Sequence, residues 1–380
     1  MMERRLYRVQ EIGVLAKLRA VSWVYVSLLV MLAGVGYVAL YSAGGGPLPF
    51  ANRHALRFGV GFLILIATAL TDLRVIKRLA WPLYGLGVGL LVMVARFGHV
   101  GKGAQRWIEI GSFQLQPSEL MKIFLVLALA SWFHRATWER IGNPFYLLPP
   151  ALATALPVAL ILKQPNLGTA VITAMVAGAV FFAAGVRWWK LALIALLVTV
   201  GAPLAYHHLH DYQRARIETF LHPESDPLGA GYNIIQSRIA LGSGGLWGKG
   251  FLNGTQGHLD FLPEKQTDFI FTVFAEEFGL IGAISLLFLI TLIIAGGFII
   301  ALRAREPFAR LLAIGITVNY SLYVFVNLAM VMGAIPVGGV PLPLISHGGS
   351  ALLTAMFGFG LLLSVEVHRD VSLTDEQDLI

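Results

Sequence analysis

The sequence predicts an all-α integral membrane protein in which ten transmembrane helices form one polytopic domain over residues 1–380. Of its residues, 57% are hydrophobic and 13% are charged, whereas a soluble domain carries about a quarter charged residues. Its apolar runs approach the roughly 20 residues that a helix needs to cross a bilayer. One polar stretch, residues 207–268, separates the seventh run from the eighth. We interpret that stretch as a large extracytoplasmic loop.

The ten apolar runs define the predicted spans in chain order. They are residues 21–42, 55–71, 79–95, 118–133, 146–162, 167–185, 189–206, 269–301, 308–333 and 348–365. The eighth run is longer than one span requires, so we expect an interfacial segment before Gly279. The chain contains no cysteine, which excludes disulfides and cysteine-ligated metals.

Basic residues predict the orientation, because Lys and Arg are enriched on the cytoplasmic side of membrane helices. The N-terminal segment is rich in Arg and Lys and lacks a cleavage site of small residues, so we interpret it as a cytoplasmic tail. Both termini are then cytoplasmic, and the loops 96–117, 207–268 and 334–347 face outward. Basic residues beside the spans account for the formal net charge of +7, which therefore does not indicate nucleic-acid binding.

The fourth span opens with polar residues at its outer end. Pro117 suits the first turn of a helix, and Glu119 and Lys122 are three residues apart, so they share a helix face and can pair. Ionisable groups in membrane helices usually face a wet cavity or the bundle interior. The pair is either functional or a salt bridge that only stabilises packing. In the preceding loop, Arg106 beside Trp107 is either a phosphate ligand or an interfacial anchor.

The long loop contains two arginines, Arg214 and Arg216, and the glycine-rich sequence SGGLWGKG at residues 243–250. That sequence lacks the Ser or Thr of a Walker motif and no strand precedes it, so it does not indicate nucleotide binding. Its glycines would let the backbone approach a ligand closely. The alternative is a flexible loop.

The loop ends at Asp268, where the eighth apolar run begins. Asp268 is either an N-cap carboxylate or a carboxylate held at the outer surface as a base or metal ligand. Glu276 and Glu277 follow within the apolar segment and indicate a wet polar cavity. The last outer loop, residues 336–350, is too rich in Pro and Gly for a regular helix, and we interpret its His347 as a structural donor.

Six sequence blocks together resemble the SEDS family (shape, elongation, division and sporulation). The blocks are GAQRW at 103–107, QPSELMK at 116–122, QPNLGT at 164–169, DPLGAGYNIIQSRIALGSGGLWGKG at 226–250, LPEKQTDFIF at 262–271 and VPLPLISHGGS at 340–350. The resemblance extends from about Trp23 to Arg369, and the order and spacing of the blocks make it specific. The glycine-rich block and the short termini resemble the elongation branch of the family more than the division branch.

The resemblance implies a ten-helix protein of the bacterial inner membrane that polymerises lipid II into peptidoglycan. Its expected partners are a class B penicillin-binding protein and other membrane proteins of the elongation complex. The resemblance implies that the essential aspartate of the family corresponds to Asp268. It also implies that Lys122, from the QPSELMK block, lies beside it. Glu119 is the third catalytic candidate. Mg²⁺ or Mn²⁺ is a candidate cofactor, with Asp268 as its candidate ligand. Candidates for substrate contact are Arg106, Arg214, Arg216, Gln116, Ser118, Glu264, Thr267 and Ser346.

Two other functions remain open from the sequence. A lipid II flippase would need polar residues through the whole membrane, and the charges here lie near the outer end. A non-catalytic scaffold of the elongation machinery would not need Asp268 and Lys122 together.

The sequence also departs from the family pattern at three places. Asn166 replaces the usual Asp, Lys265-Gln266 replaces an Arg-His or Ala-His pair, and His347 replaces a usual Tyr. A charge at position 166 and a His at position 266 are therefore not required for the chemistry of this chain.

Overall fold

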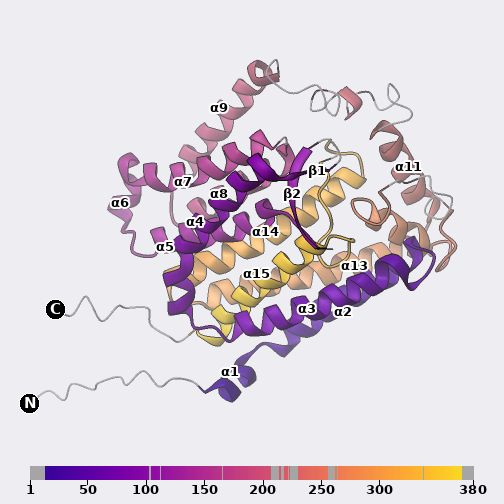
Figure 1. Cartoon of the computed structure of the whole chain (residues 1–380), viewed down its shortest axis with the longest axis horizontal. Coiled ribbons are helices and arrows are strands. Elements are labelled where there is room, and N and C mark those ends of the chain that lie inside the picture. The colour runs from indigo at the N-terminus through magenta and orange to yellow at the C-terminus, as the bar shows by residue number, and fades with distance from the viewer. Residues whose placement is uncertain are drawn as a thin grey trace, which may run out of the picture.

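The structure, a computed structural model, describes residues 13–101, 104–111, 113–164, 166–206, 214, 218–220, 222, 230–255, 262, 264–336 and 338–369. Its helices run roughly along one direction in a single bundle (Figure 1). They are α1 (Val14–Ala20), α2 (Trp23–Ala43), η1 (Pro47–Ala51), α3 (Asn52–Ala69), α4 (Leu73–Phe97), α5 (Pro117–Phe133), α6 (Trp138–Gly142), α7 (Pro144–Lys163), α8 (Leu167–Ala183), α9 (Trp188–Tyr206), α11 (Ala230–Ser243), α13 (Ile270–Arg303), α14 (Pro307–Val331) and α15 (Gly349–Val367).

Each predicted span overlaps one of these helices, and the multi-pass character of the chain is confirmed. Among the described residues, seven helical segments are long and apolar enough to cross a membrane. They are Trp23–Ala43, Pro47–Ala69, Leu73–Phe97, Pro144–Lys163, Ile270–Arg303, Pro307–Val331 and Gly349–Val367. Two further apolar helices, α8 and α9, have shorter qualifying stretches. The count of ten spans is considered below, with the proposed function.

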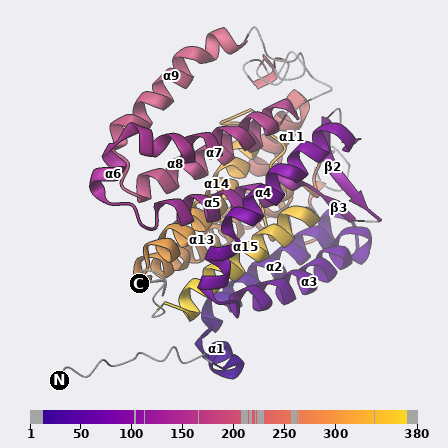
Figure 2. The same cartoon turned by 60° about the vertical axis from the view of Figure 1, so that its left-hand side comes forward.

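The core of the bundle lies around α5, α14 and α15. Helix α5 buries residues on every face and contacts α4, α7, α8, α14 and α15. A helix that is hydrophobic all round belongs in the centre of a bundle, which is where α5 lies in Figure 2. Helix α9 is the opposite case, because it projects away from the bundle and exposes most of its apolar side chains.

Helix α1 and the C-terminal end of α15 lie at the same end of the bundle, and the strands and α11 lie at the other (Figure 1). At the first end, the Lys17 Nζ donates to the Leu70 carbonyl at 3.0 Å, and the Ser364 hydroxyl donates to the Thr71 carbonyl at 2.7 Å. The second end carries Asp268 and is called the outer end below.

The outer loop 96–117 is not irregular, and here the all-α prediction is wrong. It contains an antiparallel sheet of β1 (His99–Gly101), β2 (Ala104–Ile110) and β3 (Phe113–Leu115), in the order β1-β2-β3. Strand β2 contains Trp107, Ile108 and Ile110, which are residue types enriched in strands. Gly111 has a φ of 62° at the turn into β3.

Helix α13 is broken at Gly279, as the sequence predicts. The residue has a φ of 66° and a ψ of −167°. In a continuous helix, the N–H groups of Leu280 and Ile281 would donate to carbonyls four residues earlier. Instead they donate to the carbonyls of Gly245 and Leu246, at 2.9 and 3.2 Å.

The carbonyls that this break releases belong to Glu276 and Glu277. They accept hydrogen bonds from the backbone N–H groups of Lys249 and Gly250, both at 3.0 Å. Residues 245–250 therefore replace the intrahelical bonds of the broken turn. Unpaired backbone groups cost free energy away from water. The exchanged hydrogen bonds remove that cost, so the helix can break inside an apolar bundle.

Gly248 and Gly279 allow this exchange of hydrogen bonds. A Cβ on Gly248 would overlap the carbonyl of Glu277, and one on Gly279 would overlap the amide of Gly248. Gly248 also has a φ of 80°, a conformation that side chains rarely adopt. The prediction of close backbone approach is confirmed, but the approached group is α13.

We predict that Gly279→Ala and Gly248→Ala strongly destabilise the protein, because each adds a backbone clash to the about 1–3 kcal/mol strain of a side chain at positive φ. The measurement is thermal unfolding of purified protein in detergent. Gly242→Ala is the matched control, because a Cβ there meets nothing within 4 Å. Equal melting temperatures for all three variants would contradict the exchange.

Candidate functional site

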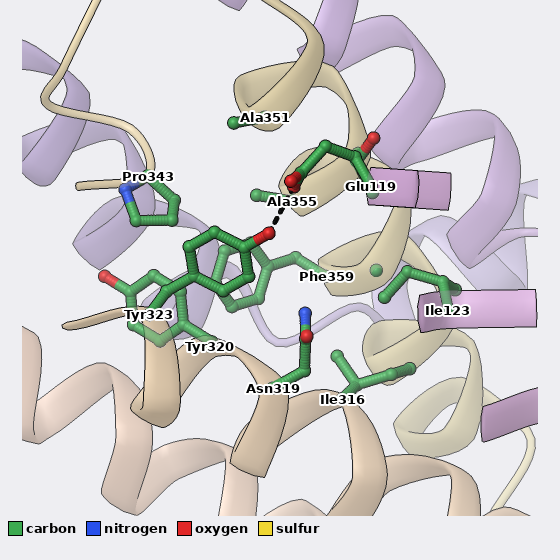
Figure 3. Close-up of a pocket in the computed structure, with 12 residues that line it drawn as sticks. Glu119, Ile123, Ile316, Asn319, Tyr320, Tyr323, Pro343, Ala351, Ala355 and Phe359 are labelled. Carbon is green, nitrogen blue, oxygen red and sulfur yellow. Dashed lines mark hydrogen bonds between the residues drawn. The ribbon is translucent and has the colours of Figure 1, made fainter. Parts of the chain in front are cut away.

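A buried ion pair lies in the first turns of α5. The Lys122 Nζ lies 3.0 Å from the Glu119 Oε1, and the two residues are 1% and 6% exposed. The pairing predicted from their spacing is confirmed. The Tyr323 hydroxyl, from α14, donates to the Glu119 Oε2 (Figure 3). The Lys122 ammonium lies 4.2 Å from the centre of the Tyr323 ring.

This arrangement explains why a charged pair is tolerated in the core. Pro117 begins the helix, so Glu119 lies in its first turn, where the helix dipole stabilises a negative charge. The tyrosine hydroxyl satisfies the second carboxylate oxygen, and its ring face attracts the ammonium. Removing one partner of such a buried pair costs about 3–5 kcal/mol.

A small pocket opens beneath Glu119 between α5, α14 and α15 (Figure 3). Asn319 and Tyr320 line it, and within the described chain the Asn319 Oδ1 and the Tyr320 hydroxyl have no hydrogen-bond partner. Its volume of about 20 Å³ suits about one water molecule. Small-molecule sites are usually hundreds of cubic ångströms, so this pocket is not the sugar-binding site.

Asp268 lies in a turn immediately before α13. The Thr267 hydroxyl donates to the Glu264 Oε2 at 2.8 Å, and the Phe269 amide donates to the Glu264 carbonyl at 3.3 Å. Glu264 and Thr267 therefore shape the turn that presents Asp268. Helix α13 begins at Ile270, its N-cap position is Phe269, and no side chain at that position caps it. The N-cap interpretation of Asp268 is not supported.

Asn327 of α14 holds the Asp268 turn in place. Its side-chain amide donates to the Asp268 carbonyl at 2.9 Å and to the Val340 carbonyl at 2.7 Å. Val340 belongs to the last outer loop. In the same loop, a Cβ on Gly339 would lie 3.7 Å from the Asp268 Oδ2. The Asp268 carboxylate therefore lies beside this loop.

One face of α14 connects the two catalytic candidates. Tyr323 contacts the Glu119–Lys122 pair and Asn327 holds the Asp268 backbone. Residues four apart on a helix lie one above the other. The residues that hold the buried pair and the Asp268 turn are thus one helical turn apart on α14.

The other polar residues of the QPSELMK block, and Ser346, make hydrogen bonds within the protein. The Gln116 amide donates to the Ser350 Oγ at 3.1 Å, and its side chain donates to the Ser118 Oγ at 3.1 Å. The Ser346 Oγ accepts from the Leu342 amide at 2.8 Å. These contacts fix the junction of α5, α15 and the last outer loop.

The predicted arginine ligands are placed less centrally. The Arg106 Nε donates to the Gln164 carbonyl at 3.3 Å, which ties β2 to the end of α7. Arg214 is half-buried in the long loop, and Arg216 lies outside the described residues. Asn166 caps α8, with its Oδ1 3.5 Å from the Thr169 amide.

Glu276 and Glu277 form a second polar cluster at the break in α13. The Glu276 Oε1 lies 2.6 Å from the Lys249 Nζ and accepts from the Thr255 hydroxyl at 3.0 Å. The Ser42 hydroxyl donates to the Glu277 Oε1. These contacts give both carboxylates a structural role beside the exchanged hydrogen bonds.

Sequence analysis did not identify Tyr323 and Asn327 as site residues. The available signal was two hydrogen-bonding side chains four residues apart in a mainly apolar span. Neither residue belongs to a motif block, and their partners lie 204 and 59 residues away.

Comparison with known proteins decides the family. A family model described as "Cell cycle protein", covering FtsW, RodA and SpoVE, matches residues 15–371. The chain belongs to this family. The resemblance to SEDS proteins found in the motif blocks is thereby confirmed.

Individual relatives agree with this assignment. The chain is 44% identical to the peptidoglycan glycosyltransferase MrdB of Escherichia coli strain K12 over 353 residues, which covers 90% of this chain and 93% of MrdB. It is 34% identical over 356 residues to the probable peptidoglycan glycosyltransferase FtsW of Idiomarina loihiensis, covering 90% of this chain and 86% of that protein.

Solved structures show the same fold. One chain of a peptidoglycan synthase complex that coordinates polymerization and crosslinking has a TM-score of 0.80 and 32% identity, with coverage of 93% of this chain and 99% of that chain. The rod shape determining protein RodA of Thermus thermophilus has a TM-score of 0.71 and 30% identity, with coverage of 93% and 98%.

We predict that Asn327→Leu destabilises the protein, because it leaves the Asp268 and Val340 carbonyls unpaired, at about 1–3 kcal/mol each. Hydrogen exchange should rise in residues 264–269 and 338–345 before the rest of the bundle. The control is Asn253→Leu, since Asn253 is exposed. Unchanged exchange in both segments would show that Asn327 does not hold the turn.

Proposed function

We propose that this chain is a peptidoglycan glycosyltransferase that polymerises lipid II into glycan strands during cell elongation. It works with a class B penicillin-binding protein, which supplies the crosslinking activity. The proposal is supported by the family, by the relatives named peptidoglycan glycosyltransferases, and by the likeness to a chain of a peptidoglycan synthase complex.

The observation that carries the proposal is the arrangement on α14. Its Tyr323 and Asn327 join the buried Glu119–Lys122 pair to the Asp268 turn. Glycosyl transfer from a lipid diphosphate requires a base near the attacking hydroxyl and positive charge near the leaving diphosphate. During the reaction the attacking hydroxyl loses its proton, and negative charge develops on the leaving diphosphate.

In this mechanism, the Asp268 carboxylate accepts the proton of the acceptor sugar hydroxyl as that oxygen bonds to the anomeric carbon of the donor. The bond from that carbon to the diphosphate oxygen breaks, and the diphosphate leaves with the electron pair. A positioned base typically contributes about 10²–10⁴-fold to the rate. Lys122 either orients Asp268 or stabilises the charge on the diphosphate.

A divalent cation at this site would need phosphate ligands from the substrate in addition to ligands from the protein. The described residues contain no group of three or more His, Asp or Glu side chains that could hold a metal. Mg²⁺ is commonly held by one or two carboxylates together with substrate phosphates. Asp268 would supply the carboxylate ligand, and the metal would supply charge neutralisation at the diphosphate.

We further propose ten spans, made by α2, α3, α4, α5, α7, α8, α9, α13, α14 and α15, with both termini in the cytoplasm. The arrangement in Figure 1, with α1 and the end of α15 at one end, supports an even number. Loop 207–268 then faces outward, where the sugars of lipid II are polymerised. Basic residues at the opposite end support this orientation.

The flippase alternative is not favoured by the charge distribution. The buried charged residues Glu119, Lys122, Glu276 and Glu277 lie within the first two turns of helices that begin at the outer end. A flippase needs a polar path through the bilayer. The scaffold alternative predicts that neither Asp268 nor Lys122 matters for polymerisation.

We predict that Asp268→Asn lowers glycan synthesis by about 10²-fold or more and leaves folding intact. The measurement gives labelled lipid II to the purified variant, with its penicillin-binding partner, and separates the products on a gel. Asp72→Asn is the matched control: Asp72 caps α4, and Asn caps about as well as Asp. Substantial synthesis by well-folded Asp268→Asn would refute the catalytic assignment of Asp268.

The orientation has a separate test. A cysteine at exposed Asn253, in this cysteine-free chain, should react with an impermeant reagent added to intact spheroplasts. A cysteine at Arg303, near the opposite end of α13, should react only after lysis. The reverse pattern would overturn the orientation.

A further inference from the structure

A second group of cationic and hydrogen-bonding side chains lies at the outer end, apart from Lys122. The Arg57 Nη1, from the second turn of α3, lies 3.2 Å from the His347 Nε2. The His347 ring packs edge-on against Phe50, with ring centres 5.1 Å apart. A Cβ on Gly349 would lie 2.9 Å from the Arg57 Nε, so the guanidinium lies against the first residue of α15.

The charge of this group is not balanced by an acid. The ion pairs between described residues do not include Arg57 or its exposed neighbour Arg53. The N-terminus of α15 adds the positive end of its dipole, and Gly348 at its N-cap gives it no side-chain cap. Three sources of positive potential therefore converge, and an anion would be stabilised there.

The His347 ring is arranged to donate a hydrogen bond. An arginine has only donors, so the Nε2 that faces Arg57 accepts and the Nδ1 carries the hydrogen. Within the described residues, this buried Nδ1 has no hydrogen-bond partner. Burial, and then Arg57, His54 and Arg53, lower the pKa of His347 to about 4. The ring is thus a neutral donor at pH 7.

This group adjoins the Asp268 turn. The His347 amide donates to the Gln266 carbonyl at 2.8 Å, and Gln266 precedes Asp268 by two residues. A ligand that contacts His347 therefore lies beside the segment that carries the proposed base.

We propose that Arg57 and His347, with the N-terminus of α15, form a binding site for the diphosphate of a lipid headgroup. The planar fork of Arg57 matches phosphate oxygens, the His347 Nε2 fixes the position of that guanidinium, and Arg53 lies at the exposed edge. Assignment of this diphosphate to lipid II rests on the proposed function. The anion site itself rests on the contacts above.

The test uses the purified full chain in phosphatidylcholine nanodiscs and undecaprenyl diphosphate as the probe. Arg57→Gln should weaken binding about tenfold or more, as expected for loss of a charge-assisted hydrogen bond. His347→Phe, which keeps the ring packing on Phe50 but removes the Nε2 contact with Arg57, should weaken it less. Arg303→Gln, an exposed arginine at the other end of α13, is the control.

Two competitors identify the source of the phosphate. Inorganic diphosphate should compete weakly, and phosphatidylglycerol should not compete. Full competition by phosphatidylglycerol would overturn the assignment to a diphosphate. Unchanged affinity of both well-folded Arg57→Gln and His347→Phe would overturn the site itself.

Failure of the proposed function would look different. Wild-type protein that binds the probe through Arg57 but synthesises no glycan with its partner would leave the site standing and remove the enzymatic proposal. If the wild-type protein polymerises lipid II but all variants bind the probe with the same affinity, the enzymatic proposal stands and the Arg57 site is refuted.

Discussion

Backbone polar groups at membrane depth must find partners within the protein, and this requirement organises the outer half of the bundle. The break in α13 is satisfied by residues 245–250. The irregular loop after α14 is held by Asn327, whose amide bridges it to the Asp268 turn. The candidate catalytic groups lie in or beside these two hydrogen-bonded segments. Their geometry therefore depends on backbone pairing as much as on side-chain packing.

Helix α14 is the element that this arrangement shares. It lies in the core against α5, α8, α13 and α15, and it carries the tyrosine and the asparagine that hold the buried pair and the aspartate turn. A rigid central helix positions functional groups more accurately than loops can. Asp268 itself lies in a turn. Asn327 of α14 holds the backbone of that turn, and Gly339, in the loop after α14, lies beside the Asp268 carboxylate.

Much of the fold was accessible from the sequence, because apolar runs and their lengths determine where membrane helices form. The break at Gly279 and the Glu119–Lys122 pair were also accessible, since each depends on neighbouring residues. The sheet at residues 99–115 was not predicted, because its strands are short and lie in a region interpreted as loop. Tyr323 and Asn327 were not identified because their roles depend on partners distant in the chain. Asp268 was left with two interpretations; α13 has Phe269 at its N-cap position, and the catalytic interpretation stays a prediction.

The exchange of hydrogen bonds between residues 245–250 and α13 also affects how genetic screens of this protein should be interpreted. Gly248 and Gly279 belong to one structural unit although they are distant in the sequence. Inactivating substitutions in the glycine-rich block would cluster beside the turn that carries Asp268 and suggest a substrate contact. Their cause would be a damaged helix, and the protein level in the membrane would fall along with activity. Suppressor mutations would then be expected in the first turns of α13 rather than around the sugar site.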